Sequence, residues 1–385
     1  MKAFILLILI GIVVFFGTSK SSVRDVAEFK QEPEFVFDEE NELELLESSS
    51  KSEIEIKEEE IIVVEEVQEI IVEIPEVISL PDSTQENVVK LVVPKKEEKP
   101  KILFKDINIS TREALVNIFC TTKFGGLFKP ITGSGIVIDE KGIILTNAHI
   151  AQYFLLKDYL TEDFVDCVVR KGSPAKPQYK AVPIFISPSW IENNAKNIRE
   201  QSPTGTGEDD YALILINKHV NPEKNIPESF SFISPEYDSE KIKINDTVLL
   251  AAYPAGFLGG ISIQKDLYLS STVTKIMELF TFKESTLDVF SIGGSIVAQQ
   301  GSSGGAVVNG ENKLLGIIVT SSTAETTQDR DLRAITISHI NRSFIKDVGF
   351  DLQTIFSGDV AAEAEAFNKN IAPILTQFLE NELDK

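Results

Sequence analysis

The chain has 385 residues, a formal net charge of −22 and only two cysteines. This length accommodates about two domains, and an acidic balance without a Lys/Arg-rich patch argues against nucleic acid as a partner. Most of the net charge, about −15, lies between Thr18 and Pro100, so the amino-terminal quarter is far more acidic than the rest of the chain.

The first residues have the pattern of an export signal. Lys2 precedes an uncharged apolar run from Ala3 to Gly17, and a short positive region before such a run is typical of secretion. The run is shorter than the roughly 20 residues that usually span a membrane. Over residues 1–19 a cleaved signal peptide and an uncleaved membrane anchor therefore both remain open. In either case we expect export and a place in the cell envelope, membrane-anchored or secreted.

A long acidic segment follows the apolar run. Its glutamate clusters repel one another, and aromatic residues are nearly absent after Phe37. Such a segment does not bury enough apolar surface to offset chain entropy. We therefore expect a disordered, low-complexity spacer over residues 20–105. Its Ile/Val-rich stretch at 54–77 leaves open pairing as edge strands or folding on a partner.

From Ile107 the composition changes to short β-rich runs separated by Gly, Pro, Asn and Asp. Runs of this length at close spacing predict an antiparallel, all-β architecture in two halves. The first half has six predicted strands: Ala114–Cys120, Gly133–Ile138, Ile143–Asn147, Val165–Arg170, Ala181–Ile186 and Tyr211–Ile216. The second half has six more: Thr247–Ala252, Leu267–Ile276, Val289–Ile292, Ala306–Val308, Leu314–Thr320 and Arg333–Ile337.

Helical spacing is confined to a few places. Ile340, Phe344 and Ile345 predict a helix at Ser338–Val348, and a short helix is expected at Asn193–Arg199. Apolar residues three and four apart across 351–385 predict an amphipathic helical extension. That extension packs either on the barrel or on a neighbouring subunit.

Three stretches carry residues that suit nucleophilic catalysis. Thr146-Asn147-Ala148-His149 ends a predicted strand, Asp209 and Asp210 open the strand at 211–216, and Gly301-Ser302-Ser303-Gly304-Gly305 precedes another strand. Glycines in such a turn let several N–H groups point at one spot. Each stretch alone has an ordinary explanation: a strand-end surface histidine, a turn cap or a Gly/Ser hairpin loop.

Together, in the order His, Asp, Ser, these motifs resemble the trypsin-like (chymotrypsin-fold) serine peptidases, most closely the HtrA-like bacterial branch. The resemblance covers roughly 107–349. It implies a peptidase domain over 106–350 built from two six-stranded antiparallel β-barrels, roughly 106–234 and 235–350, with a closing carboxy-terminal helix. The extension at 351–385 is too short to hold the PDZ domain that HtrA-like enzymes usually carry.

The resemblance also implies roles for the site residues. Ser303 would be the nucleophile, His149 the general base, and Asp210, rather than the neighbouring Asp209, the carboxylate that orients the imidazole. The N–H groups of Gly301 and Ser303 would form the oxyanion hole. The expected activity is that of a serine endopeptidase acting on polypeptides through an acyl-enzyme, in protein processing or quality control. The alternative is a catalytically silent scaffold with the same fold.

By alignment with the family, five residues line the primary specificity pocket: Val297, Ala298, Thr320, Ser321 and Ala334. Because position 297 is not acidic, we expect a preference for a small or medium apolar side chain rather than Arg or Lys.

Two further expectations concern the remaining chemistry. Cys120 and Cys167 lie in strands that are neighbours in this fold, and an exported protein favours a disulfide between them; two buried thiols are the alternative. No residue spacing resembles a metal site or a phosphate-binding loop, so we expect neither a metal nor a cofactor. The sequence identifies no partner for His219 or His339.

Overall fold

The structure is a computed structural model. It describes residues 29–30, 102–123, 130–200, 204–256, 260–282, 286–321 and 331–385. The expected export signal and nearly all of the expected spacer lie outside the described residues. Within the described ranges, no helix has both the length and the apolar character needed to cross a membrane.

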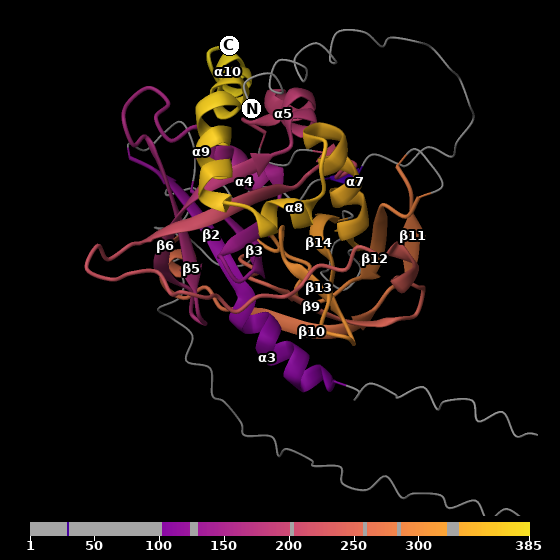
Figure 1. The fold of residues 1–385 in the computed structure, drawn as a ribbon. Coiled ribbons are helices and arrows are strands. Elements are labelled where there is room, and N and C mark those ends of the chain that lie inside the picture. The colour runs from indigo at the N-terminus through magenta and orange to yellow at the C-terminus, as the bar shows by residue number, and fades with distance from the viewer. Residues whose placement is uncertain are drawn as a thin grey trace, which may run out of the picture. The chain divides into compact units, whose positions relative to one another are not determined.

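The first half forms the predicted six-stranded antiparallel barrel, with the strands in the closed order β2-β3-β4-β8-β6-β5. Figure 1 labels β2, β3, β5 and β6 of this barrel. The strands are β2 (Leu115–Thr122), β3 (Ile131–Asp139), β4 (Ile143–Thr146), β5 (Val165–Lys171), β6 (Lys176–Ile186) and β8 (Ala212–His219). Each of the six β-rich runs gives one strand, with ends that differ by a few residues. β4 is buried along its whole length, as an apolar run covered on both faces should be.

The second half differs from the predicted second barrel. Seven strands, rather than six, form a curled sheet in the order β10-β9-β13-β14-β15-β12-β11, which makes an open half-barrel in the described part of the chain. The strands are β9 (Thr247–Ala252), β10 (Ser270–Lys275), β11 (Glu278–Phe280), β12 (Val289–Gly293), β13 (Ala306–Asn309), β14 (Leu314–Ser321) and β15 (Leu332–Thr336).

The extra strand arises from an abrupt change of partner. The N–H of Ile276 still donates to the Asp246 carbonyl beside β9, whereas the N–H of Met277 donates to Ser291 in β12. β10 and β11 therefore end at opposite edges of the sheet instead of closing it. The predicted strand at Leu267–Ile276 is shortened to β10.

Helices cover the strands on several sides. The helices that precede the carboxy-terminal group are α3 (Phe104–Ala114), α4 (Ala148–Leu155), α5 (Pro188–Asn194) and α6 (Gly260–Lys265), with 3-10 turns η2 (Ala195–Asn197) and η3 (Ser239–Lys241). α3 was not expected; it packs on β3, β9 and β13. The helix expected at Asn193–Arg199 begins earlier, because Ser187 caps the Trp190 N–H and Pro188 occupies the first turn.

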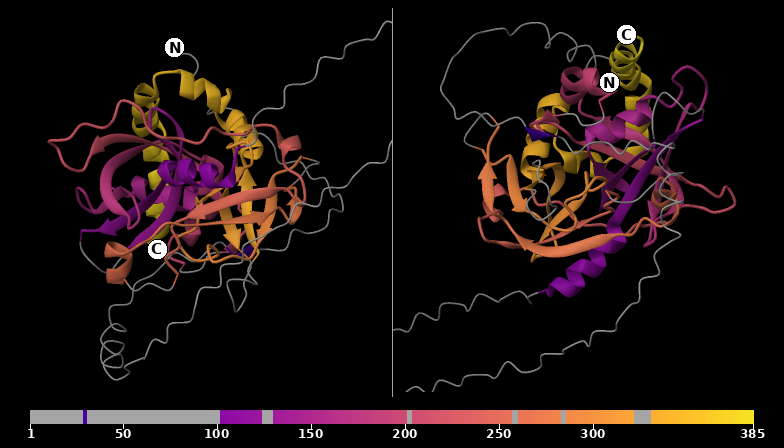
Figure 2. Two further views of the ribbon diagram at one scale, coloured as in Figure 1. Left: turned by 90° about the horizontal axis from the view of Figure 1, so that it is seen from below. Right: turned by 180° about the vertical axis from the view of Figure 1, so that it is seen from behind.

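Four helices end the chain: α7 (Ile337–Val348), α8 (Leu352–Ser357), α9 (Val360–Asn370) and α10 (Ala372–Leu383). α7 matches the predicted closing helix; Thr336 caps its start, and Gly349 ends it at φ 90°. α9 packs on β6, and α10 packs on α4, α5 and η2. Figure 2 shows α9 and α10, in yellow, beside the strands of the first barrel. Of the two expectations for the extension, packing on the barrel therefore holds in this chain.

β9 separates two cores. Leu249 and Ala251 belong to the large core that also includes the barrel and the carboxy-terminal helices. Val248 and Leu250 belong to a smaller core inside the seven-stranded sheet. This division follows from the alternation of side chains along a strand. A short pair, β1 (Phe29–Lys30) with β7 (Thr204–Gly205), completes the described strands.

Candidate active site

His149 lies at the start of a helix rather than at the end of a strand. β4 ends at Thr146, Asn147 takes extended backbone angles, and α4 begins at Ala148. The residue is 3% exposed, and the Trp190 ring lies 6.5 Å from its imidazole between centroids. The strand-to-helix junction therefore presents a buried histidine on a rigid element.

Asp210 contacts this histidine at two points. Its Oδ2 lies 2.7 Å from His149 Nδ1, and its Oδ1 accepts the His149 backbone N–H at 3.0 Å. The Asp210 carbonyl accepts from Asn147 Nδ2 at 2.9 Å. Because an ionised carboxylate only accepts hydrogen bonds, Nδ1 carries a proton and Nε2 is the basic nitrogen.

A tight turn directs Asp209 and Asp210 to different partners. Gly207 and Asp209 both have positive φ, 79° and 59°, a conformation that glycine and aspartate tolerate. The Asp209 carboxylate accepts from Ser343 Oγ at 2.7 Å, on α7. Asp210 thus contacts His149, whereas the side chain of Asp209 contacts Ser343.

Backbone hydrogen bonds within the turn and to β14 hold the turn that contains Ser303. The N–H of Ser302 donates to the Gln299 carbonyl, that of Gly304 to Ile318 and that of Gly305 to Ser302, at 3.2, 2.9 and 2.8 Å. Ser302 Oγ donates to the Val297 carbonyl. Gly301 and Gly304 have φ of 86° and 78°, which explains why glycine flanks the Ser302–Ser303 pair. Ser303 itself is 3% exposed.

Ser134 and Thr146 connect this turn to the histidine. The Ser134 N–H donates to the Ser303 carbonyl at 2.7 Å, and Ser134 Oγ donates to the Gly301 carbonyl at 2.8 Å. Thr146 Oγ1 donates to the Ser134 carbonyl at 2.7 Å. The serine turn is thus fixed to the end of β4, immediately before α4 and His149. Sequence reasoning missed Ser134; a polar residue between two glycines in an otherwise apolar strand was the available signal.

The residues predicted for the specificity pocket lie in the second half. Val297, Ala298 and Ala334 belong to the core of the seven-stranded sheet. Thr320 is buried on β14, and its methyl group would lie 3.2 Å from a Cβ placed on Gly207. β14 therefore packs against the turn that carries Asp210. Ser321 ends that strand, and its side chain lies outside the described part.

The two cysteines form a disulfide between β2 and β5. Their sulfurs are 2.04 Å apart, and the two residues are directly opposite in the antiparallel register. The bond therefore joins two neighbouring strands of the first barrel.

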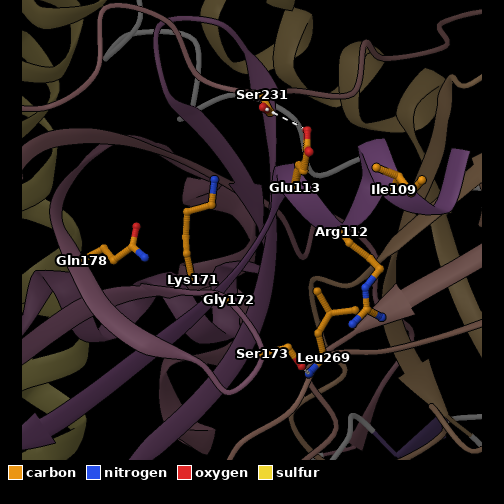
Figure 3. Close-up of a pocket in the computed structure, with 9 residues that line it drawn as sticks. All are labelled: Ile109, Arg112, Glu113, Lys171, Gly172, Ser173, Gln178, Ser231 and Leu269. Atoms are coloured by element: carbon orange, nitrogen blue, oxygen red, sulfur yellow. Dashed lines mark hydrogen bonds between the residues drawn. The ribbon is translucent and has the colours of Figure 1, made fainter. Parts of the chain in front are cut away.

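A cavity of about 520 Å³ lies between α3 and the loop after β5 (Figure 3). Arg112, Glu113 and Lys171 give it a mixed charge, and burial lowers the pKa of the Lys171 ammonium. None of its lining residues is a candidate catalytic residue.

Residues 133–317 match the family model of a trypsin-like peptidase domain. This part of the chain is therefore a trypsin-like peptidase domain, which suggests a serine peptidase. Among solved structures, the chain is similar to one described as the crystal structure of the Rv3671c protease from M. tuberculosis in its active form. That likeness has 16% identity and a TM-score of 0.39, and covers 67% of this chain and 94% of that one. No curated protein matches the chain in sequence.

Proposed function

We propose that the trypsin-like peptidase domain of this chain is an active serine endopeptidase, with Ser303 as nucleophile, His149 as general base and Asp210 as the orienting carboxylate. The observation that carries the proposal is the contact of 2.7 Å between His149 Nδ1 and Asp210 Oδ2. This contact fixes the tautomer in which Nε2 accepts a proton, and a serine hydroxyl needs such a base at neutral pH.

The reaction follows from these roles. Ser303 Oγ attacks the carbonyl carbon of the scissile peptide while its proton passes to His149 Nε2. The resulting oxyanion accepts hydrogen bonds from the N–H groups of Gly301 and Ser303. The C–N bond then breaks as Nε2 returns the proton to the leaving amine, which leaves an acyl-enzyme. Water, deprotonated by His149, hydrolyses the ester and regenerates Ser303.

The rigid turn around Ser303 supports this assignment. Catalytic groups must be held close to their productive geometry, because a misplacement of about 1 Å costs roughly a hundredfold in rate. The contacts of Ser134 with the carbonyls of Gly301 and Ser303 hold the turn at two points. They place the proposed oxyanion donors on a fixed backbone.

We place the enzyme in the HtrA-like branch, exported to the cell envelope and either tethered to the membrane or secreted. The support is the apolar run from Ala3 to Gly17 behind Lys2, the acidic segment after it, and the three motifs in order. Processing or quality control of polypeptides is the role that fits. Because position 297 is not acidic, we expect cleavage after small or medium apolar side chains rather than after Arg or Lys.

Hydrolysis of an unfolded protein substrate, followed by mass spectrometry of the products, tests the activity. The wild-type chain should cleave, and Ser303→Ala should not, while Ser357→Ala, at an exposed serine that ends α8, should retain activity. A folded wild-type chain without hydrolysis would instead support the silent scaffold. Cleavage mainly after Arg or Lys would contradict the proposed preference.

A further inference from the structure

A second buried histidine lies behind the candidate triad. His339, on α7, is 9% exposed. Its Nδ1 lies 3.0 Å from Asp288 Oδ1, and its Nε2 lies 3.4 Å from Asp209 Oδ1. The Phe282 ring packs edge-on against it at 4.9 Å between centroids. The imidazole thus bridges two carboxylates from opposite halves of the domain.

This arrangement favours the imidazolium form. Ionised carboxylates only accept hydrogen bonds, and a neutral imidazole has one nitrogen that also only accepts. A neutral ring would therefore place a lone pair against either Asp209 or Asp288. Burial pulls the pKa of His339 down, but its hydrogen bonds to Asp209 and Asp288 outweigh burial, and the net pKa is raised.

The bridge reaches the candidate catalytic acid through the backbone. Asp209 has φ of 59° and directly precedes Asp210. On the other side, the Tyr211 hydroxyl donates to Ser343 Oγ at 3.2 Å, and Ser343 Oγ donates to Asp209. Both neighbours of Asp210 are therefore anchored to α7, while Asp210 itself faces His149.

The other end of the bridge is firmly fixed. Asp288 accepts from the Phe282 N–H at 2.8 Å and from Thr286 Oγ1 at 3.1 Å, and it pairs with Arg342. Burial raises the pKa of the Asp288 carboxyl, but the hydrogen bonds from His339, the Phe282 N–H and Arg342 outweigh burial, and the net pKa is lowered. His339 is thus held against a carboxylate that stays ionised.

The charged groups around the bridge come from four elements. Asp209 precedes β8, Asp288 precedes β12, and Arg342, Lys346 and Asp347 lie on α7 itself. Glu192, on α5, acts on Asp347 rather than on His339. Asp209 and Asp288 are the two that face the imidazole directly.

We propose that His339 is a positioning residue: its imidazolium, held between Asp288 and Asp209, fixes the left-handed turn that presents Asp210 to His149. This inference rests on the proposed peptidase function. It predicts that loss of the His339 proton at alkaline pH leaves the turn without a cation between two carboxylates, so that the turn loosens and turnover falls.

His339→Gln tests this, because glutamine keeps a hydrogen-bonding side chain but not the charge. Since the turn acts on catalytic geometry, we expect kcat to fall roughly tenfold or more while KM changes little. We also expect the alkaline decline of the wild-type pH–rate profile to disappear in this variant. His219→Gln, at the far end of β8, is the matched control and should behave like wild type.

A second measurement uses no change at position 339. The chain has three histidines, so NMR titration of Ser303→Ala should resolve them, with His339 assigned from the glutamine variant. We expect the pKa of His339 above the ordinary value of about 6.5, and a lower pKa when Asp209→Asn is added.

The outcomes separate the two proposals. An active wild type with His339→Gln indistinguishable from it in kcat, or a His339 pKa at or below its ordinary value, would overturn the positioning role alone. A folded but inactive wild type would overturn the peptidase function, whatever the titration shows.

Discussion

The Asp210 carboxylate binds His149 twice, through Oδ2 on the ring at 2.7 Å and through Oδ1 on the backbone N–H at 3.0 Å. The first contact fixes the tautomer of the imidazole, and the second fixes the start of α4. One buried side chain therefore sets both the protonation and the placement of the candidate base.

Replacement of Asp210 by asparagine should nearly abolish turnover. The asparagine amide donates where the carboxylate accepted, which favours the wrong tautomer of His149; the equivalent change in trypsin lowers kcat by about 10⁴. Steady-state kinetics on a peptide substrate measures the effect. Asp209→Asn should lose far less, roughly tenfold. Equal losses in the two variants would contradict the assignment.

Gly304→Ala should damage the serine turn more than an ordinary glycine substitution. A Cβ at 304 would lie 2.1 Å from the Ser134 carbonyl oxygen, and φ is 78°. We expect a loss of roughly 2–4 kcal/mol in the free energy of unfolding together with loss of activity. Gly349→Ala is the control, because it has φ of 90° but open space around the Cβ, and it should cost only about 1 kcal/mol. Chemical denaturation compares them.

Removal of the disulfide should destabilise the first barrel. The bond between Cys120 and Cys167 closes a loop with a sequence separation of 47, for which chain entropy predicts about 4 kcal/mol. The double variant Cys120→Ala/Cys167→Ala should show this loss in denaturant. A reductant should destabilise the wild type but leave the double variant unchanged. Equal stability of wild type and variant under oxidising conditions would contradict the prediction.

Ionisation of Asp347 should weaken the fold as the pH rises through about 6. Burial first, and then Asp209, raise the pKa of its carboxyl to about 6. A raised carboxyl pKa contributes stability below the unfolded value of about 4, which is lost as pH rises through 6. Relative to Asp347→Asn, the wild type should therefore lose about 1–2 kcal/mol of unfolding free energy between pH 5 and pH 8. A difference that stays constant with pH would argue against a raised pKa.

The carboxy-terminal helix should contribute directly to the stability of the barrel. Leu379 is fully buried on α10, which packs on α4, whereas the adjacent Phe378 is 38% exposed. Leu379→Ala should cost about 2–5 kcal/mol, and Phe378→Ala less than about 1 kcal/mol. Thermal unfolding of the two variants gives the comparison; similar shifts would mean that α10 is not packed as described.

The strands of the first barrel were predictable because each β-rich run in the sequence is bounded by turn residues. The open form of the second sheet was not predictable from the sequence, because it depends on the short strand β11 and on the change of hydrogen-bond partner between Ile276 and Met277. Helix α3 was predictable only in part. Its buried residues Ile107, Thr111 and Ala114 are spaced four and three apart, but they lie at a boundary in composition.

The residues of the candidate site also divide into those that were predictable from the sequence and those that were not. His149, Asp210 and Ser303 stand in short motifs that are visible along the chain. Ser134 and His339 act through partners far away in sequence, 167 residues for the Gly301 carbonyl and 130 for Asp209. No local pattern reports such contacts, so only the fold brings them together.

Covalent labelling at a single serine tests the central claim most directly. A fluorophosphonate should modify the folded wild-type chain, and peptide mapping should place the adduct on Ser303. Labelling should be abolished in Ser303→Ala and reduced at least a hundredfold in rate in His149→Ala, because the hydroxyl then lacks its base. An adduct on another residue, or labelling of Ser303 at an unchanged rate without His149, would contradict the account.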